Sequence, residues 1–117
     1  MIVEDIQIKN KLAHIQGRKI KMPKGYLVAN IRVQDKEKFA AFSGMAAPII
    51  EGYGGKVLAR GPNAERHEGQ LTGVVMMIEF ESLETAKKFY LSEEYQAAKA
   101  IRDECSETDL MLIEGTE

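Results

Sequence analysis

The stretch that decides the fold is EGYGGKVLARG, residues Glu51–Gly61. Its glycines follow a helical pattern and precede a short apolar run, which is typical of a helix end and a turn into a strand. A glycine-rich phosphate cradle has the opposite order, a strand first and a helix second. The stretch therefore predicts a helix-to-strand junction, and the elements on either side of it set the topology.

Apolar periodicity predicts the elements around this junction. Alternation of apolar and polar residues predicts strands, and apolar residues at three- and four-residue spacing predict helices. The resulting order is β-α-β-β-α-β, which predicts an α+β fold, a ferredoxin-like β-α-β-β-α-β sandwich. The expected strands cover residues 25–33, 56–60, 73–81 and about 109–113, and the expected helices begin at Asp35, Ser82 and Ser92.

The first helix carries signals at both ends and one conflict inside. Asp35 is a good N-cap, and Gly54 can adopt the left-handed conformation that ends a helix near Tyr53. Pro48 removes one backbone donor, so we expect it to bend the helix or to split it near Met45. The expected buried stripe consists of Phe39, Phe42, Ala46, Ile49 and Tyr53.

The composition is that of one globular domain. The chain has 117 residues, of which 44% are hydrophobic and 29% charged, and it contains no apolar run long enough to span a membrane. Its single cysteine, Cys105, cannot form an internal disulfide, and its acidic neighbours disfavour a reactive thiolate. We expect a cytoplasmic protein in which Cys105 has a packing role.

Charge divides the chain into two parts. Residues 1–24 carry six Lys or Arg against two acids, whereas residues 25–117 carry ten against sixteen. We expect an N-terminal extension over residues 1–24, forming a short hairpin or preceding a true start at Met22, and one domain over residues 25–117. Because the domain is acidic, we expect no nucleic-acid partner, and no membrane partner either.

Catalytic and metal-binding motifs are missing from the sequence. It contains no GxSxG, HExxH or P-loop motif, and its two histidines and one cysteine are too few and too far apart for a structural zinc site. We therefore expect no metal and no cofactor. His67 lies in a polar loop, where it is either a solvated residue or a lid residue that titrates near neutral pH.

The clearest functional signal is the second face of the predicted sheet. If Leu27, Ala29 and Ile31 pack on the helices, the opposite face is too apolar to remain in water. Such a face is either a pocket wall or a dimer interface. The candidate pocket residues are Tyr26 and Asn30 for hydrogen bonds, Arg60 for an anionic group, Glu79 as a base, and His67 as a lid.

Several motifs together resemble one known family. The segments KGYLVANIRVQDKEKFAAF, YGGKVLARG, VVMMIEFESLETAKKFYLSEEYQAAKAIR and DLMLIEG, with Glu68–Gly69 between them, are similar to the domain of unknown function 1330 family. The resemblance covers Lys24 to about Gly115. It implies a dimeric α/β barrel in which two ferredoxin-like sheets face each other. It carries over no catalytic residue, and Pro62 departs from a glycine common in the family pattern.

Two functional hypotheses follow from the sequence. The first is a small homodimeric α/β-barrel protein that binds a small molecule in a pocket of the sheet face, with cofactor-free catalysis as an extension of it. The second is a structural or interaction module whose sheet face serves only for dimerisation.

Overall fold

The computed structural model describes residues 22–116. The elements follow the order expected from the sequence, including two separate helices that begin after Ser82 and Ser92. The elements are β1 Gly25–Val33, α2 Lys36–Gly52, β2 Lys56–Gly61, β3 Val74–Phe80, α3 Leu83–Leu91, α4 Glu93–Cys105 and β4 Ser106–Glu114.

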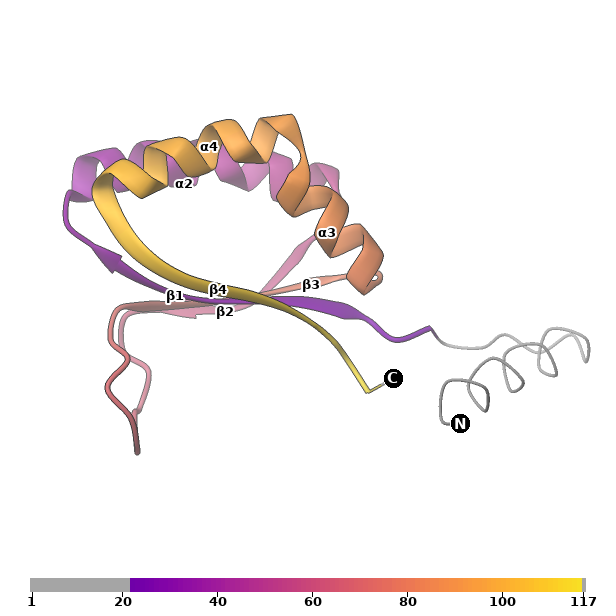
Figure 1. Ribbon diagram of the computed structural model, residues 1–117, viewed down its shortest axis with the longest axis horizontal. Helices are drawn as coiled ribbons and strands as arrows, with labels where there is room; N and C mark the ends of the chain where they lie inside the picture. Colours follow the sequence, from indigo (N-terminus) through magenta and orange to yellow (C-terminus); the bar gives the residue numbers. More distant parts are fainter. Residues whose placement is uncertain (1–21, 117) are drawn as a thin grey trace, which may run out of the picture.

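The strands form one antiparallel sheet in the order β2-β3-β1-β4. Within residues 22–116, helices α2, α3 and α4 lie on one side of this sheet, and the loop between β2 and β3 extends from the other side (Figure 1). This is the expected α+β, ferredoxin-like arrangement. The face that carries the helices is called here the helix face, and the opposite one the open face. The predicted extension over residues 1–24 lies almost entirely outside the described residues.

Helix α2 begins as expected but continues through its proline. Asp35 accepts hydrogen bonds from the backbone N–H groups of Glu37 and Lys38, both at 3.1 Å. The helix is continuous to Gly52 with Pro48 inside it, so the expectation of a split near Met45 is wrong. The apolar stripe packs on both sides of Pro48, and this packing outweighs the one lost hydrogen bond. Gly54, at φ 75°, makes the expected left-handed turn.

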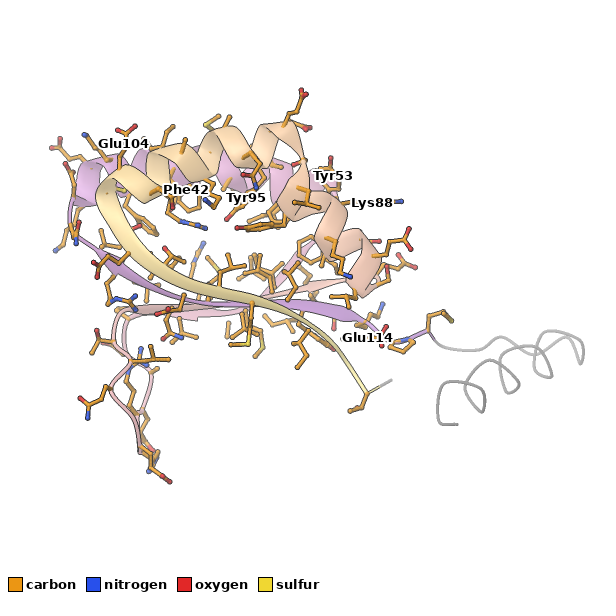
Figure 2. All side chains as sticks on the ribbon, in the orientation of Figure 1. Phe42, Tyr53, Lys88, Tyr95, Glu104 and Glu114 are labelled. Carbon is orange, nitrogen blue, oxygen red and sulfur yellow. The ribbon has the colours of Figure 1, made fainter. Side chains whose placement is uncertain are left out.

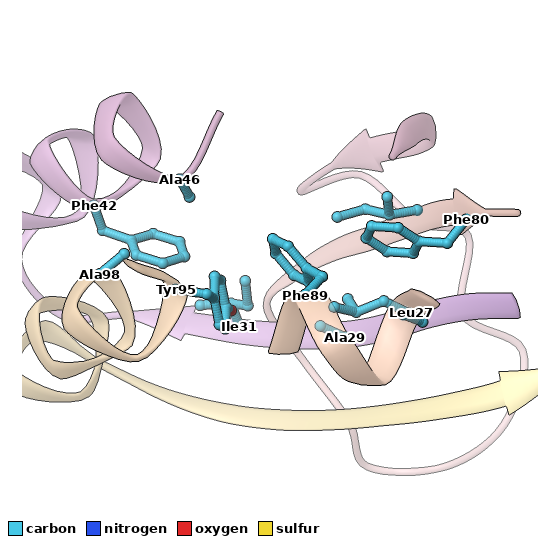
Figure 3. Packing of buried hydrophobic residues seen from close by; sticks show 11 residues of the cluster. Leu27, Ala29, Ile31, Phe42, Ala46, Phe80, Phe89, Tyr95 and Ala98 are labelled. Carbon is cyan, nitrogen blue, oxygen red and sulfur yellow. The ribbon is translucent and has the colours of Figure 1, made fainter. Parts of the chain in front are cut away.

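The core lies between the helix face and the helices (Figure 3). Leu27, Ala29 and Ile31 of β1 are buried, as alternation along the strand predicts. From β3 the side chains of Ile78 and Phe80 join them. Aromatic rings fill the centre, and Phe89 lies 4.5 Å from Tyr95 and 5.1 Å from Phe80 between ring centroids. The remaining buried apolar residues are Phe42, Ala46, Ala86, Ala98 and Cys105.

Strand β4 begins three residues earlier than the sequence indicates. It starts at Ser106, immediately after α4, and pairs with β1 along its whole length, from Val33 opposite Ser106 to Gly25 opposite Glu114. Residues such as Ser106 and Asp109 favour turns locally. Pairing with a neighbouring strand supplies the backbone hydrogen bonds that a turn would otherwise provide, and this tertiary effect extends the strand.

Candidate functional site

A cavity of about 350 Å³ lies between helix α2 and the helix face of the sheet. Its inner wall is formed by core residues, among them Ala29, Ile31 and Phe89. Its mouth lies between α2 and the edge strand β2, where the exposed residues of the lining gather. These mouth residues are Ser43, Ala47 and Glu51 of α2, and Val57 and Arg60 of β2.

Small residues explain why the core leaves this volume unfilled. Helix α2 packs mainly against α4 rather than on a strand. Where α2 faces the cavity it presents Ala46 and Ala47, and Ala29 lies on the sheet side. Protein interiors are normally packed without voids much larger than a water molecule. A volume of this size, with a mouth to solvent, is therefore typical of a binding site.

A buried arginine lies on the wall of this cavity. Arg102, in the last turn of α4, is only 3% exposed. One of its terminal nitrogens donates a hydrogen bond to the Tyr95 hydroxyl at 2.7 Å, and its guanidinium lies over the ring of Phe42 at 5.7 Å. Phe42 and Tyr95 project from α2 and α4 toward the sheet (Figure 2). The guanidinium is therefore held in place by a phenol and an aromatic face.

The positive charge of Arg102 is balanced only in part. Its nearest carboxylate is that of Asp103, at 3.5 Å, and the Asp103 side chain is 48% exposed. The Nε atom of Arg102 is buried and has no hydrogen-bond partner among the described residues. An unpaired buried donor on a charged group is costly and uncommon in native proteins. This arrangement is thus more typical of a ligand site than of a packed core.

Tyr95 remains a hydrogen-bond donor at neutral pH. Burial raises the pKa of Tyr95 above 10.0, although the nearby Arg102 charge opposes this shift. The neutral phenol accepts from Arg102 and keeps its own hydrogen for another partner. Arg102 and Tyr95 both line the cavity, and together they bring a positive charge and the hydroxyl donor of Tyr95 to its wall.

A β-bulge brings Arg60 to the cavity mouth. Val57 is opposite Ile78, but Ala59 rather than Leu58 is opposite Met77, so Leu58 is an extra residue in β2. One extra residue exchanges the two faces for everything that follows it. Arg60 is therefore opposite Met76 on the helix face, whereas simple alternation from Lys56 places it on the open face.

The five candidate residues from the sequence do not converge on one pocket. Tyr26 and Glu79 are opposite each other on the open face, where the Tyr26 hydroxyl donates to Glu79 Oε2 at 3.4 Å. Asn30 is on the same face but four residues farther along β1, about 13 Å away. Arg60 lies on the other side of the sheet. His67 is an exposed loop residue that contacts Glu65 at 2.7 Å.

Arg60 and Glu79 therefore do not face each other. The residue of β2 opposite Glu79 is Lys56. The bulge at Leu58 is the physical reason, because it turns Arg60 away from the face that carries Glu79. Of the five candidates, Arg60 alone lines the helix-side cavity.

Sequence reasoning missed Arg102 and Tyr95 as site residues, although a signal was present. Arg102 follows Tyr95 by seven residues and Ala98 by four, so all three share one helix face. A charged residue on an otherwise apolar stripe is seldom fully buried without a specific role. The pattern alone did not reveal that a cavity faces this stripe.

Comparison with known proteins places the chain by fold. A protein of unknown function from Rhodopseudomonas palustris is 18% identical, with 93% of this chain and 94% of that chain covered and a TM-score of 0.65. A cofactor-independent oxygenase from Streptomyces nogalater is 10% identical, with coverages of 81% and 95% and a TM-score of 0.58. At these identities the likeness shows a shared fold and nothing about the reaction.

A third structure carries the fold's name. A dimeric protein of unknown function from Bacteroides fragilis, described as having a ferredoxin-like fold, is 16% identical, covers 78% of this chain and 95% of its own, and has a TM-score of 0.50. No curated protein matches the chain. Within residues 22–116 no helix has the length and apolar character needed to cross a bilayer. The model of the family "Domain of unknown function (DUF1330)" matches residues 24–116, and the chain therefore belongs to that family.

Proposed function

We propose that this protein binds a small molecule in the cavity between α2, α4 and the helix face of the sheet. The observation that carries the proposal is the 350 Å³ cavity, whose wall includes the buried and incompletely paired Arg102. Ligand pockets begin at about 300 Å³ and combine apolar walls with a few polar groups. The site differs from the one expected from the sequence, which lay on the open face.

The mouth of the cavity allows a direct test of this proposal. Ala47 is exposed on α2 and lines the mouth, so Ala47→Phe should block entry without disturbing the core. Ala41→Phe is a matched control, because Ala41 is exposed on the same helix and does not line the cavity. A ligand at about 100 times its Kd stabilises the folded state by about 2.7 kcal/mol, which thermal unfolding detects.

The expected result is a set of compounds that raise the unfolding temperature of the wild type and of Ala41→Phe but not of Ala47→Phe. The proposal is wrong if no compound in a broad metabolite library stabilises the wild type, or if the stabilisation persists unchanged in Ala47→Phe.

The open face supports homodimerisation as a second part of the proposal. Met77, Val28 and Met111 form an apolar row across β3, β1 and β4. Met111 is 59% exposed, and Ile113 nearby is 53% exposed. A second copy covering this face would remove these side chains from water. This arrangement would be the dimeric α/β barrel expected from the sequence.

Dimerisation is tested by light scattering at micromolar concentration. The expected mass is twice that of the 13.1 kDa chain. Met111→Lys should shift the protein toward the monomer, because it would bury an unpaired charge at the interface. Leu91→Lys is the control, since Leu91 is 70% exposed on α3, on the other side of the sheet. If the wild type is a monomer, the proposed dimeric barrel is wrong.

Catalysis without a cofactor is the second candidate function. The fold is shared with the Streptomyces oxygenase, and the inner wall of the cavity is formed by buried apolar residues, where electrostatic interactions are stronger than in water. Any compound found by the screen can be incubated with the protein in air and recovered for mass spectrometry. A transformed compound supports an enzyme. Quantitative recovery of the unchanged compound supports a binding protein. If the screen finds no ligand at all, the result supports the structural or interaction module.

A further inference from the structure

The inner wall of the cavity offers hydrogen-bond donors without matching acceptors. Arg102 directs one terminal nitrogen to Tyr95 and has a second within 3.5 Å of Asp103, while its buried Nε–H has no partner among residues 22–116. The Tyr95 hydroxyl accepts a hydrogen bond from Arg102, and no residue among the described ones accepts the hydrogen of this hydroxyl. An arginine with a purely structural role usually has its buried N–H groups paired.

The charge of the lining has one sign at its inner end. Among the described lining residues Glu51 is the only carboxylate, and it is exposed at the mouth. Asp103, which contacts Arg102, does not line the cavity. A guanidinium that is 3% exposed and incompletely paired carries a large desolvation cost, which an anion beside it would offset. The inner end of the cavity is therefore complementary to a negative charge.

The rest of the wall is apolar and partly aromatic. Phe42, Phe89 and Tyr95 contribute rings, and Ile31, Ile78 and Leu110 contribute aliphatic surface. A fully charged or sugar-like molecule would lose its hydration here without finding replacement hydrogen bonds. The body of the ligand is therefore apolar, and a ring fits beside the three aromatic side chains.

From these observations we infer that the ligand is a small aromatic or alicyclic carboxylate, whose carboxylate pairs with the Arg102 guanidinium and accepts a hydrogen bond from the Tyr95 hydroxyl while its ring lies against the apolar wall. This inference rests on the proposed function and adds the chemical class of the ligand. The forked guanidinium is suited to this role, because its planar N–H groups match the geometry of a carboxylate.

The test uses matched carboxylates and amides with the full chain. The probes are benzoate with benzamide, 3-phenylpropionate with its amide, and 2-naphthoate with 2-naphthamide, titrated by calorimetry at neutral pH. Each pair has the same size and shape but differs in charge. For the pair that fits the cavity, the carboxylate should bind at least about tenfold more tightly, a difference of about 1.4 kcal/mol.

Substitutions assign the preference to its residues. Arg102→Met keeps an apolar stem and should abolish the preference for the carboxylate while leaving binding of the amide. Lys87→Met removes one positive charge from the exposed surface of α3 and should leave the preference intact. Tyr95→Phe keeps the ring and removes one donor, so it should weaken carboxylate binding by about tenfold to 150-fold, the range of a single hydrogen bond to a charged group. Circular dichroism verifies that each variant is folded.

The outcomes separate the ligand class from the proposed function. If amides bind as tightly as carboxylates, or if Arg102→Met retains the preference, the ligand class is wrong and the proposed function stands. If Arg102→Met does not fold, the wild-type comparison and Tyr95→Phe still decide the ligand class. If no compound of either series binds and the metabolite library also gives no stabilisation, the proposed function fails as well.

Discussion

Replacing Phe89 by alanine should remove the centre of the aromatic core. The Phe89 side chain is completely buried on α3. Its ring centroid lies 4.5 Å from that of Tyr95, 5.1 Å from that of Phe80 and 6.0 Å from that of Tyr53. Phe89→Ala therefore breaks three ring contacts that join α3 to α4, to β3 and to the end of α2.

The magnitude follows from the burial and from the neighbouring cavity. Removing a fully buried phenylalanine side chain costs about 3–5 kcal/mol, and the cost rises with the volume left empty. Phe89 already borders the cavity under α2, so the space left by its ring would enlarge a volume that is already empty. The lost ring contacts add to the cost of losing buried apolar surface, since each contact is worth about 0.5–1.5 kcal/mol. We expect a loss near 4–5 kcal/mol, a large part of a typical stability of about 5–15 kcal/mol.

Urea unfolding followed by far-ultraviolet circular dichroism measures this loss, because the chain contains no tryptophan for fluorescence. Wild type and variant must be compared at one protein concentration, since the proposed dimerisation would make the stability depend on concentration. Leu91→Ala is the control on the same helix. Leu91 is 70% exposed, and its loss should change the stability by no more than about 0.5 kcal/mol. A loss below about 2 kcal/mol for Phe89→Ala would contradict the described packing.

Three further predictions concern a helix cap, a close approach and the response to alkali. Ser82→Ala removes the acceptor for the Thr85 N–H at 3.0 Å and should cost about 1 kcal/mol in urea unfolding. Gly25→Ala would place a methyl group 2.4 Å from the backbone oxygen of Ser82, and the resulting overpacking should cost about 1–3 kcal/mol; an unchanged midpoint would mean that β1 and α3 are farther apart. Burial raises the pKa of Tyr95, so the folded state favours the neutral phenol; this contribution is present below pH 10 and is lost as the pH rises through the raised pKa. The stability of Tyr95→Phe should therefore decline less above pH 10 than that of the wild type, and parallel pH profiles would contradict the described burial of Tyr95.

Most of the fold was predictable because it depends on local patterns. Alternation along residues 25–33 identified the buried side of β1, and Asp35, Ser82 and Ser92 marked the starts of the helices. These signals are local because a strand repeats every two residues and a cap acts within one turn. The open face of the sheet was likewise expected to be apolar, and the exposed side chains of Met111 and Ile113 confirm this expectation.

The candidate site was less predictable, because it depends on where elements meet. Alternation alone predicts that Arg60 lies on the open face. Because Leu58 is an extra residue that forms a β-bulge, Arg60 instead lies at the cavity mouth. A bulge is decided by the pairing of two strands, and nothing in the sequence of one strand specifies it. The sequence by itself thus determined the order of elements, their caps and the apolar faces of the sheet. Two features were decided by the tertiary structure alone. Helix α2 packs on α4 above small residues, which opens the cavity, and Arg102 is buried at the cavity wall with an unpaired nitrogen. Neither follows from the sequence of one element, because voids and unpaired buried groups arise only when separate elements pack together.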